Sequence, residues 1–117
     1  MARAEEPRGA NDARRDAIAG NEVVFRDVNE RIADLGSADG LDAVRVLCEC
    51  GDRDCVRELV LARSEYETLR ADPVLFAVAP GHVAPDVEVP VAENDRFWTV
   101  RKRPGEQEQA RASDPPT

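Results

Sequence analysis

The sequence predicts a small α+β domain, in which antiparallel strands follow an N-terminal helix and enclose one short helix. Three observations lead to this prediction. Apolar residues recur at three- and four-residue spacing between residues 18 and 35, which is typical of a helix packed on one side. Short alternating apolar segments, separated by Gly, Pro, Asn or Asp, follow between residues 44 and 101 and are typical of strands. A helical capping pattern interrupts them near residue 64.

The N-terminal part divides into a polar tail and a helix. Residues 1–10 are small and charged and contain Pro and Gly, so we expect them to be disordered. Residues 11–36 are predicted to form the N-terminal helix, with 21–35 its firmest part because Gly20 can divide it. Its apolar stripe consists of Ile18, Phe25, Val28, Ile32 and Leu35.

This stripe has two interpretations. The favoured one is that it packs against the protein's own sheet, because its length is below the three heptads that a coiled coil needs. The other is that Phe25, Val28 and Ile32 form a seam for self-association or dock on a protein partner.

Residues 41–103 form the predicted β-rich domain. A first strand is expected over 44–50, a Gly-Asp turn over 51–54, and a second strand from Cys55 through residue 61. Ser64 as N-cap and Glu67 at the third helical position predict a short helix over roughly 65–72.

The rest of this domain is expected to be β-structure. A buried strand over 74–79 leads into the Pro80-Gly81 turn, and a hairpin pairs 87–91 with 97–101. Pro90 has no backbone N–H to donate, which predicts an edge strand. Residues 104–117 are polar with Pro, Gly and Gln, and we expect them to be disordered.

A metal-type cluster of residues organises this domain. All three cysteines, Cys48, Cys50 and Cys55, lie within eight residues, and the only histidine, His82, follows the Pro-Gly turn. Three thiolates and one imidazole complete the tetrahedral ligand set that Zn²⁺ prefers. A core of this size supplies little stability by itself, and a bound metal ion would add to it. The sequence therefore predicts a zinc-stabilised domain with a structural Cys3His site, in which metal binding and folding are coupled.

Two alternatives to this site stay open. The cysteines can be small buried hydrophobes with His82 a surface imidazole, although three thiols around a Gly-Asp turn fit that poorly. If His82 is not the fourth ligand, then Asp52, Asp54 or a water molecule takes that place. Glu49, with the two aspartates, is interpreted as a solvated carboxylate of the turn.

Composition restricts the function classes. The net charge of −8 disfavours nucleic acid or an anionic membrane as the main partner. No signal peptide or apolar run of transmembrane length is visible, so we expect a cytoplasmic protein, where thiols stay reduced. No catalytic nucleophile can be assigned, because the one histidine that could activate it is already assigned to the metal-type cluster. No Gly-rich phosphate-binding loop is visible, and no small-molecule site is evident.

The first functional interpretation is a zinc-binding module for protein interaction or regulation, with Trp98 as a further contact residue. The second is a zinc-containing nucleic-acid binder that uses Trp98 and the cations Arg96, Arg101, Lys102 and Arg103. The third is a metal-dependent hydrolase or a thiol redox sensor, which requires an open coordination position or a labile thiolate.

The motifs also resemble those of a known family. They comprise Phe25-Arg26-Asp27-Val28-Asn29-Glu30, Cys48-Glu49-Cys50 with Cys55, and Pro80-Gly81-His82. Together they are similar to a family of small uncharacterised bacterial proteins, mostly actinobacterial, over roughly residues 20–102. The resemblance implies that the helix and the metal-type motif belong to one unit, and it implies no catalytic residue.

Overall fold

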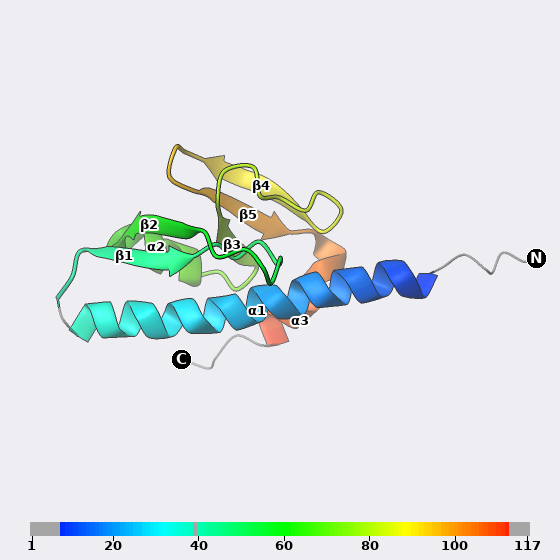
Figure 1. Cartoon of the computed structure of the whole chain (residues 1–117), viewed down its shortest axis with the longest axis horizontal. Coiled ribbons are helices and arrows are strands. Elements are labelled where there is room, and N and C mark those ends of the chain that lie inside the picture. The colour runs from blue at the N-terminus through cyan, green and yellow to red at the C-terminus, as the bar shows by residue number, and fades with distance from the viewer. Residues whose placement is uncertain (1–7, 39, 113–117) are drawn as a thin grey trace, which may run out of the picture.

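One long helix carries two small antiparallel sheets in the computed structural model, which describes residues 8–38 and 40–112 (Figure 1). Helix α1 (Arg8–Ala38) runs along the molecule, and both sheets lie on one side of it (Figure 1). The protein is therefore an α+β domain, as predicted. The remaining elements are β1 (Ala43–Leu47), β2 (Glu58–Ala62), α2 (Arg63–Arg70), β3 (Leu75–Val78), β4 (Glu88–Glu93), β5 (Trp98–Lys102), the 3-10 turn η2 (Pro104–Glu106) and α3 (Gln107–Ala112).

The strands form two separate sheets. β1 pairs with β2, and β5 lies between β3 and β4. Pro90 therefore lies on an edge strand, as its missing N–H requires. Inward-facing residues of both sheets share one core with α2, and its fully covered members include Val46, Leu61, Val74, Phe76 and Val100.

The buried face of α1 is not the predicted apolar stripe. Val28 and Leu35 are 38% and 70% exposed, and Phe25 and Ile32 are half-buried. The prediction that the whole stripe packs on the protein's own sheet is therefore wrong. The buried residues are instead Ala19, Glu22, Arg26, Asn29 and Ala33, at the same helical spacing but on another face.

Hydrogen bonds explain why a polar face can be buried, because a buried polar group is stable only when it has a partner. Asn29 Nδ2 donates to the Leu47 carbonyl, and Asn29 Oδ1 accepts from the Leu47 N–H, at 2.8 and 2.9 Å. The Arg26 guanidinium donates to the carbonyls of Pro73 and Ala110 and lies over the Phe76 ring. Polar contacts thus help to fix helix α1 to the domain, together with Ala33 and Ile32, which pack in or against the core.

Two further predictions need correction at element ends. Helix α2 begins at Arg63, not after Ser64. Its N-cap residue is Ala62, whose N–H donates to the carboxylate of Glu65 at the third helical position at 2.7 Å. The chain beyond Arg103 continues into η2 and α3, where disorder was predicted. Local composition gave no sign of this helix because a tertiary contact holds it, the hydrogen bond from the Arg26 guanidinium to the Ala110 carbonyl.

The predicted terminal tails lie partly outside the described residues. Of the expected disordered tail 1–10, the described part is already helical from Arg8. Residues 113–117 of the C-terminal tail lie outside the described residues. Helix α1 continues without a break through Gly20.

Candidate metal centre

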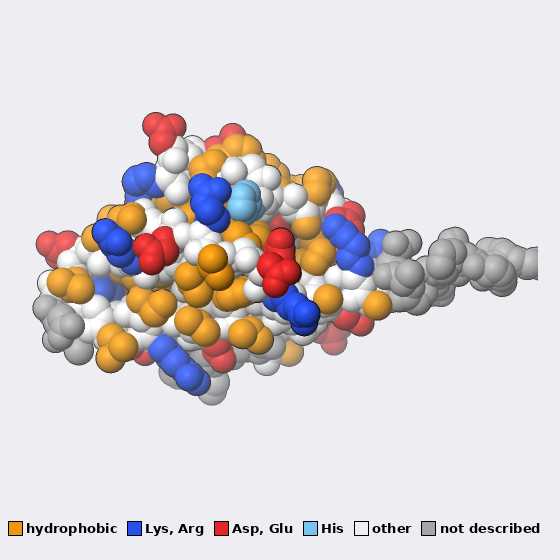
Figure 2. Space-filling view, viewed as in Figure 1, with side chains coloured by type: hydrophobic (Ala, Val, Ile, Leu, Met, Phe, Trp, Pro, Cys, Tyr) orange, Lys and Arg blue, Asp and Glu red, His pale blue; other side chains and the backbone are white. Residues whose placement is uncertain are grey.

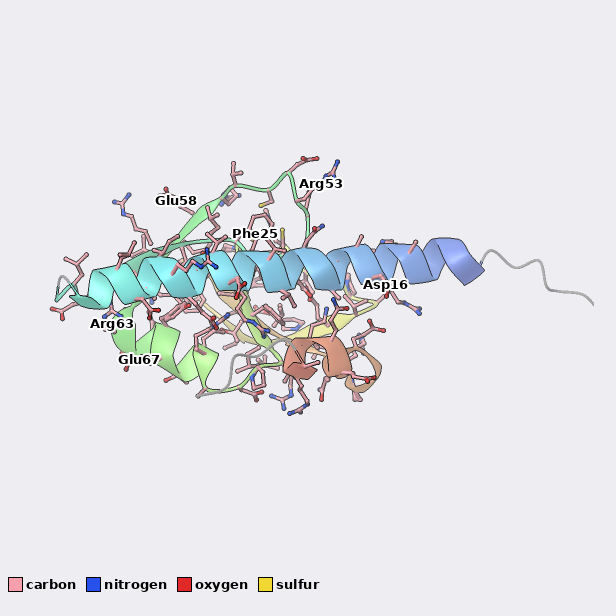
Figure 3. All side chains as sticks on the ribbon, turned by 90° about the horizontal axis from the view of Figure 1, so that it is seen from below. Asp16, Phe25, Arg53, Glu58, Arg63 and Glu67 are labelled. Carbon is pink, nitrogen blue, oxygen red and sulfur yellow. The ribbon has the colours of Figure 1, made fainter. Side chains whose placement is uncertain are left out.

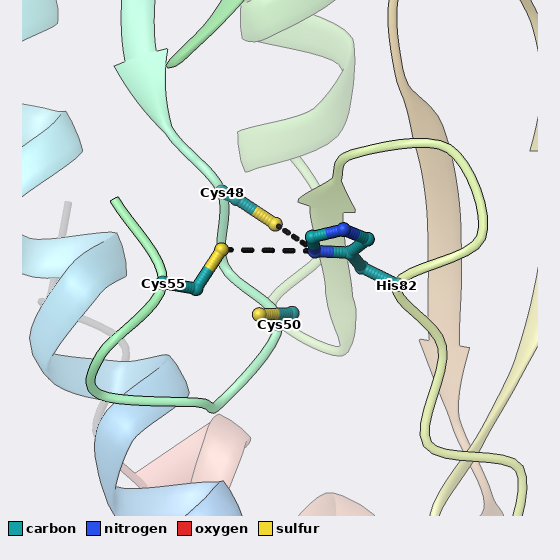
Figure 4. A group of neighbouring side chains, drawn as sticks. All are labelled: Cys48, Cys50, Cys55 and His82. Atoms are coloured by element: carbon teal, nitrogen blue, oxygen red, sulfur yellow. Dashed lines mark hydrogen bonds between the residues drawn. The ribbon is translucent and has the colours of Figure 1, made fainter. Parts of the chain in front are cut away.

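The four residues with soft ligand atoms meet between the two sheets. Cys48 and Cys50 follow β1, Cys55 lies in the loop before β2, and His82 follows β3. One ligand atom from each of the four lies within 4.8 Å of the other three. Figure 4 shows the three thiols on one side and the imidazole reaching them from the opposite segment. Segments 34 residues apart in the chain are thus brought together.

The spacing fits a tetrahedral ion. His82 Nδ1 lies 3.7 Å from Cys48 Sγ and 3.6 Å from Cys55 Sγ. Two ligands of a tetrahedral zinc, at about 2.3 Å for sulfur and about 2.0–2.1 Å for nitrogen, are separated by roughly 3.6 Å. The donor set also suits zinc, since thiolate and imidazole are its usual ligands. The residues present therefore fit a divalent ion bound through Nδ1 of His82.

Backbone contacts fix the segment that carries the first two thiols. The N–H of Cys48 donates to the Arg57 carbonyl at 2.8 Å, which extends the β1–β2 pairing by one residue. The N–H of Glu49 donates to the Ala77 carbonyl at 2.8 Å, so the same segment runs along β3. The predicted strand over 44–50 therefore ends at Leu47, and its last residues connect the two sheets.

Glu49 is a buried hub rather than the solvated turn carboxylate that was predicted. Its side chain is completely covered. Its carboxylate accepts hydrogen bonds from Asn29 Nδ2 and Arg70 Nη2, both at 2.8 Å, and from the Ala77 N–H at 3.0 Å. Three donors, one of them the Arg70 cation, offset the cost of burying the charge. Glu49 thus ties α1, α2 and β3 to the segment that carries Cys48 and Cys50.

The turn between Cys50 and Cys55 depends on glycine. Gly51 has φ +86°, and a Cβ there would lie 2.6 Å from Cγ2 of Ile18. Asn21 Nδ2 donates to the Gly51 carbonyl at 2.8 Å, which fixes the turn to α1. The Cys55 N–H then donates to the Asp52 carbonyl at 2.9 Å and turns the third thiol back toward the first two.

The thiols affect one another's protonation. The hydrogen bond between the Cys48 and Cys50 side chains raises the pKa of Cys48 and lowers the pKa of Cys50 to about 5. Burial raises the pKa of Cys48 further. The Ala79 N–H also donates to Cys48 Sγ at 3.1 Å. Because metal binding requires thiolates, an ion entering the site would displace the proton that Cys48 retains.

The candidate contact residues are spread over the surface. Figure 2 shows apolar side chains gathered over the part of the face where α1 runs. Val28 is exposed, Phe25 and Ile32 are half-buried, and Trp98 lies half-buried on the separate strand β5. The structure therefore does not bring Trp98 onto the α1 stripe. Figure 3 shows α1 crossing the molecule, with the loop that carries Arg53 on one side and α2 and α3 on the other.

Most of the predicted nucleic-acid cations have partners within the protein. Arg96 forms a two-point ion pair with Glu65, and Arg101 pairs with Asp72 at 2.9 Å. Lys102 is 2% exposed. Arg103 is exposed and donates to the Pro85 carbonyl. The four cations therefore do not form one continuous basic surface, which the nucleic-acid alternative would need.

Sequence reasoning missed the buried polar residues. Glu22, Arg26 and Asn29 recur at helical spacing, which was visible, but polar residues with this spacing usually mark a solvated face. Lys102 was assigned to a surface cluster, yet its Nζ contacts Glu22 at 2.7 Å and Glu88 at 3.5 Å inside the protein. No local signal separates such residues from surface charges.

Fold and site together define a small α+β protein with a Cys3His cluster that could hold a metal ion. No family model matches the chain, and neither do any of the curated proteins or solved structures with which it was compared. None of the helices in the described part combines the length and apolar character that crossing a bilayer requires.

Proposed function

We propose that this protein is a small zinc-binding module, in which a structural Cys3His zinc fixes the domain for contacts with a protein partner. The observation that carries this proposal is the meeting of three thiols and one imidazole, all within 4.8 Å, from segments distant in the chain. Zinc is favoured over other ions because the donors are sulfur and nitrogen and the two printed nitrogen–sulfur spacings, 3.6 and 3.7 Å, match a tetrahedral site.

The ion would stabilise the protein where regular structure is sparse. The segment 48–57 between β1 and β2 and the segment 79–87 between β3 and β4 contain no helix or strand. A metal bound by Cys48, Cys50, Cys55 and His82 would join these two segments. Structural zinc contributes about 10–16 kcal/mol of binding free energy in small zinc peptides, and part of this would appear as folding stability.

A role in protein contacts is supported by the exposed apolar side chains. Val24, Val28 and Leu35 on α1 are 58%, 38% and 70% exposed, and Leu41 and Val60, which line one hollow with Leu35, are 53% and 42% exposed. Exposed apolar side chains in a contiguous group are typical of an interaction surface. The four-ligand set leaves no open coordination position, which supports a structural rather than a hydrolytic ion.

The test is a metal analysis of the purified protein paired with one ligand variant. We expect about one zinc per chain, and we expect Cys50→Ser to lose most of the zinc and much of the stability. Val56→Thr is the matched control, because Val56 lies in the same loop, is 72% exposed and offers no ligand. A stable protein that contains no zinc and takes up none from solution would refute the proposal.

A further inference from the structure

The ligands of the candidate centre differ sharply in accessibility. Cys48 is completely buried within the core, whereas Cys50, Cys55 and His82 are each half-buried. Cys48 Sγ also accepts a hydrogen bond from the Ala79 N–H, which further shields it. A reagent in solution therefore meets Cys50 or Cys55 before it meets Cys48.

A hollow leads from the solvent to the centre. It has a volume of about 310 Å³ and is lined among others by Arg14, Ile18, Cys50, His82 and Val83. A hydroperoxide of a few atoms fits easily into this volume. Thus the hollow exposes one thiolate ligand, Cys50, to small molecules.

We propose that the centre is also a peroxide-sensitive switch, in which a hydroperoxide oxidises Cys50 and Cys55 to a disulfide and the zinc ion is released. This inference rests on the proposed function, because it requires the bound ion. It deepens that function by giving the same site a regulator, a hydroperoxide.

The chemistry balances with the peroxide as the oxidant. The Cys50 thiolate attacks one peroxide oxygen, so that an S–O bond forms, the O–O bond breaks and hydroxide (or alkoxide) leaves. The Cys55 thiolate then attacks the Cys50 sulfur and displaces a second hydroxide, giving the disulfide. Two thiolates lose two electrons in total and one peroxide gains them. The ion keeps only two protein ligands and dissociates.

The loop allows the disulfide to form. The turn from Asp52 to Cys55 already holds the two sulfur atoms within 4.8 Å, and they must approach to about 2.05 Å. Gly51 is buried against α1, but Asp52, Arg53 and Asp54 are exposed, so Cys55 can move toward Cys50 while Gly51 keeps its place. Cys48 would remain a free thiol. Release of zinc would disconnect His82 from this loop, which is the structural change that a partner would sense.

The experiment treats the full-length, zinc-loaded protein with hydrogen peroxide and follows zinc with a colorimetric chelator. We expect one zinc released for each disulfide formed, with free thiols falling from three to one. Peptide mapping should then find Cys50 joined to Cys55, and a thiol reductant with added zinc should restore the loaded form. Zinc retained in excess peroxide, or a disulfide that includes Cys48, would overturn the inference.

A variant of the hollow tests the route of access. Val83 lines the hollow without being a ligand, so Val83→Trp should narrow it and make peroxide-driven zinc release several-fold slower at unchanged zinc content. Val91→Trp, on β4 outside this hollow, is the matched control and should release zinc at the original rate. Equal rates for the two variants would refute access through the hollow.

The two proposals fail in different ways. If the protein binds no zinc, the proposed function itself is wrong. If zinc binds at one per chain but peroxide neither releases it nor reduces the thiol count, then only the switch is wrong and the structural site stands.

Discussion

Replacement of Glu22 by glutamine tests the buried charge cluster beneath α1. Lys102 Nζ lies 2.7 Å from Glu22 Oε1 and 3.5 Å from Glu88 Oε1, and all three residues are at most 2% exposed. Two carboxylates and one ammonium leave one uncompensated negative charge if both acids are ionised. Glu22 Oε2 and Glu88 Oε1 have no hydrogen-bond partner. A proton on Glu22 Oε2 that is donated to Glu88 Oε1 would give both of these oxygen atoms a hydrogen-bond partner.

Electrostatics point to the same proton. Burial, together with the neighbouring Glu88, raises the pKa of Glu22 well above its usual range. A raised pKa means that the folded protein binds a proton that the unfolded chain releases above pH of about 4.3. The stabilisation is complete below that pH and declines as the pH rises, until it is lost above the folded pKa. The slope in this window is about 1.4 kcal/mol per pH unit for one proton.

The Glu22→Gln side chain imitates the protonated acid. Its amide oxygen accepts from Lys102 and its NH₂ group donates to Glu88, so both hydrogen bonds persist at every pH. We expect the variant to approach the wild type in stability at low pH and to exceed it as the pH rises through the window. Lys102→Met is the contrasting change and should cost about 3–5 kcal/mol, because it leaves buried carboxylates without their cation.

Urea unfolding at a series of pH values between 5 and 8.5 measures the effect. The quantity of interest is the difference in unfolding free energy between variant and wild type, because the pH dependence of the Cys3His cluster cancels in it. Glu67→Gln, exposed on α2, serves as the control and should give a constant difference. A pH-independent difference for Glu22→Gln, or a loss of more than about 2 kcal/mol at every pH, would contradict the shared proton.

Three further predictions concern the site and the surface of α1. Gly51→Ala should cost clearly more stability than Gly81→Ala. Both glycines have positive φ, where alanine costs about 1–2 kcal/mol of strain, but of the two only Gly51 would place its new Cβ against a neighbour, at 2.6 Å. Equal losses of stability in thermal unfolding would refute this. Glu49→Leu should destabilise the fold by about 3–5 kcal/mol, since Arg70 would lose its buried partner, and chemical denaturation that shows a loss below 1 kcal/mol would count against the hub. Leu35→Ser should change stability by no more than about 0.5 kcal/mol, because Leu35 is 70% exposed; a large loss by the same assay would mean that the residue packs within the monomer.

The agreement between sequence and structure is closest where local signals are strong. The hairpin 87–101 was predictable because valines alternate around a short Asn-Asp turn, and Pro90 marked its edge strand. The Cys3His cluster was predictable because cysteine and histidine are rare in this chain and all three cysteines lie within eight residues. The N-cap of α2 was missed by two residues, since Glu65 and Glu67 are both plausible glutamates for the third helical position.

The face of α1 shows why the rest was not predictable. Spacing at three and four residues defines two faces here, one apolar and one polar, and apolarity alone favours the wrong one. Arg26 is buried because Phe76 and the carbonyls of Pro73 and Ala110 meet there in the folded protein. Those partners are far away in the chain, so no local window contains them. Helix α3 was missed for the same reason, because Ala110 supplies one of these carbonyls.

The sequence by itself determined the fold class, most of the strands and the four residues that can bind a metal, because each depends on periodicity, turn chemistry or residue type. Only the tertiary structure decided which face of α1 is buried, that Glu49 and Lys102 are internal, and that Cys50 is the thiol reached from a hollow. These properties depend on partners that are remote in sequence. The residue type alone does not show whether a charged side chain is buried, because burial is stable only where the folded chain supplies partners for the charge.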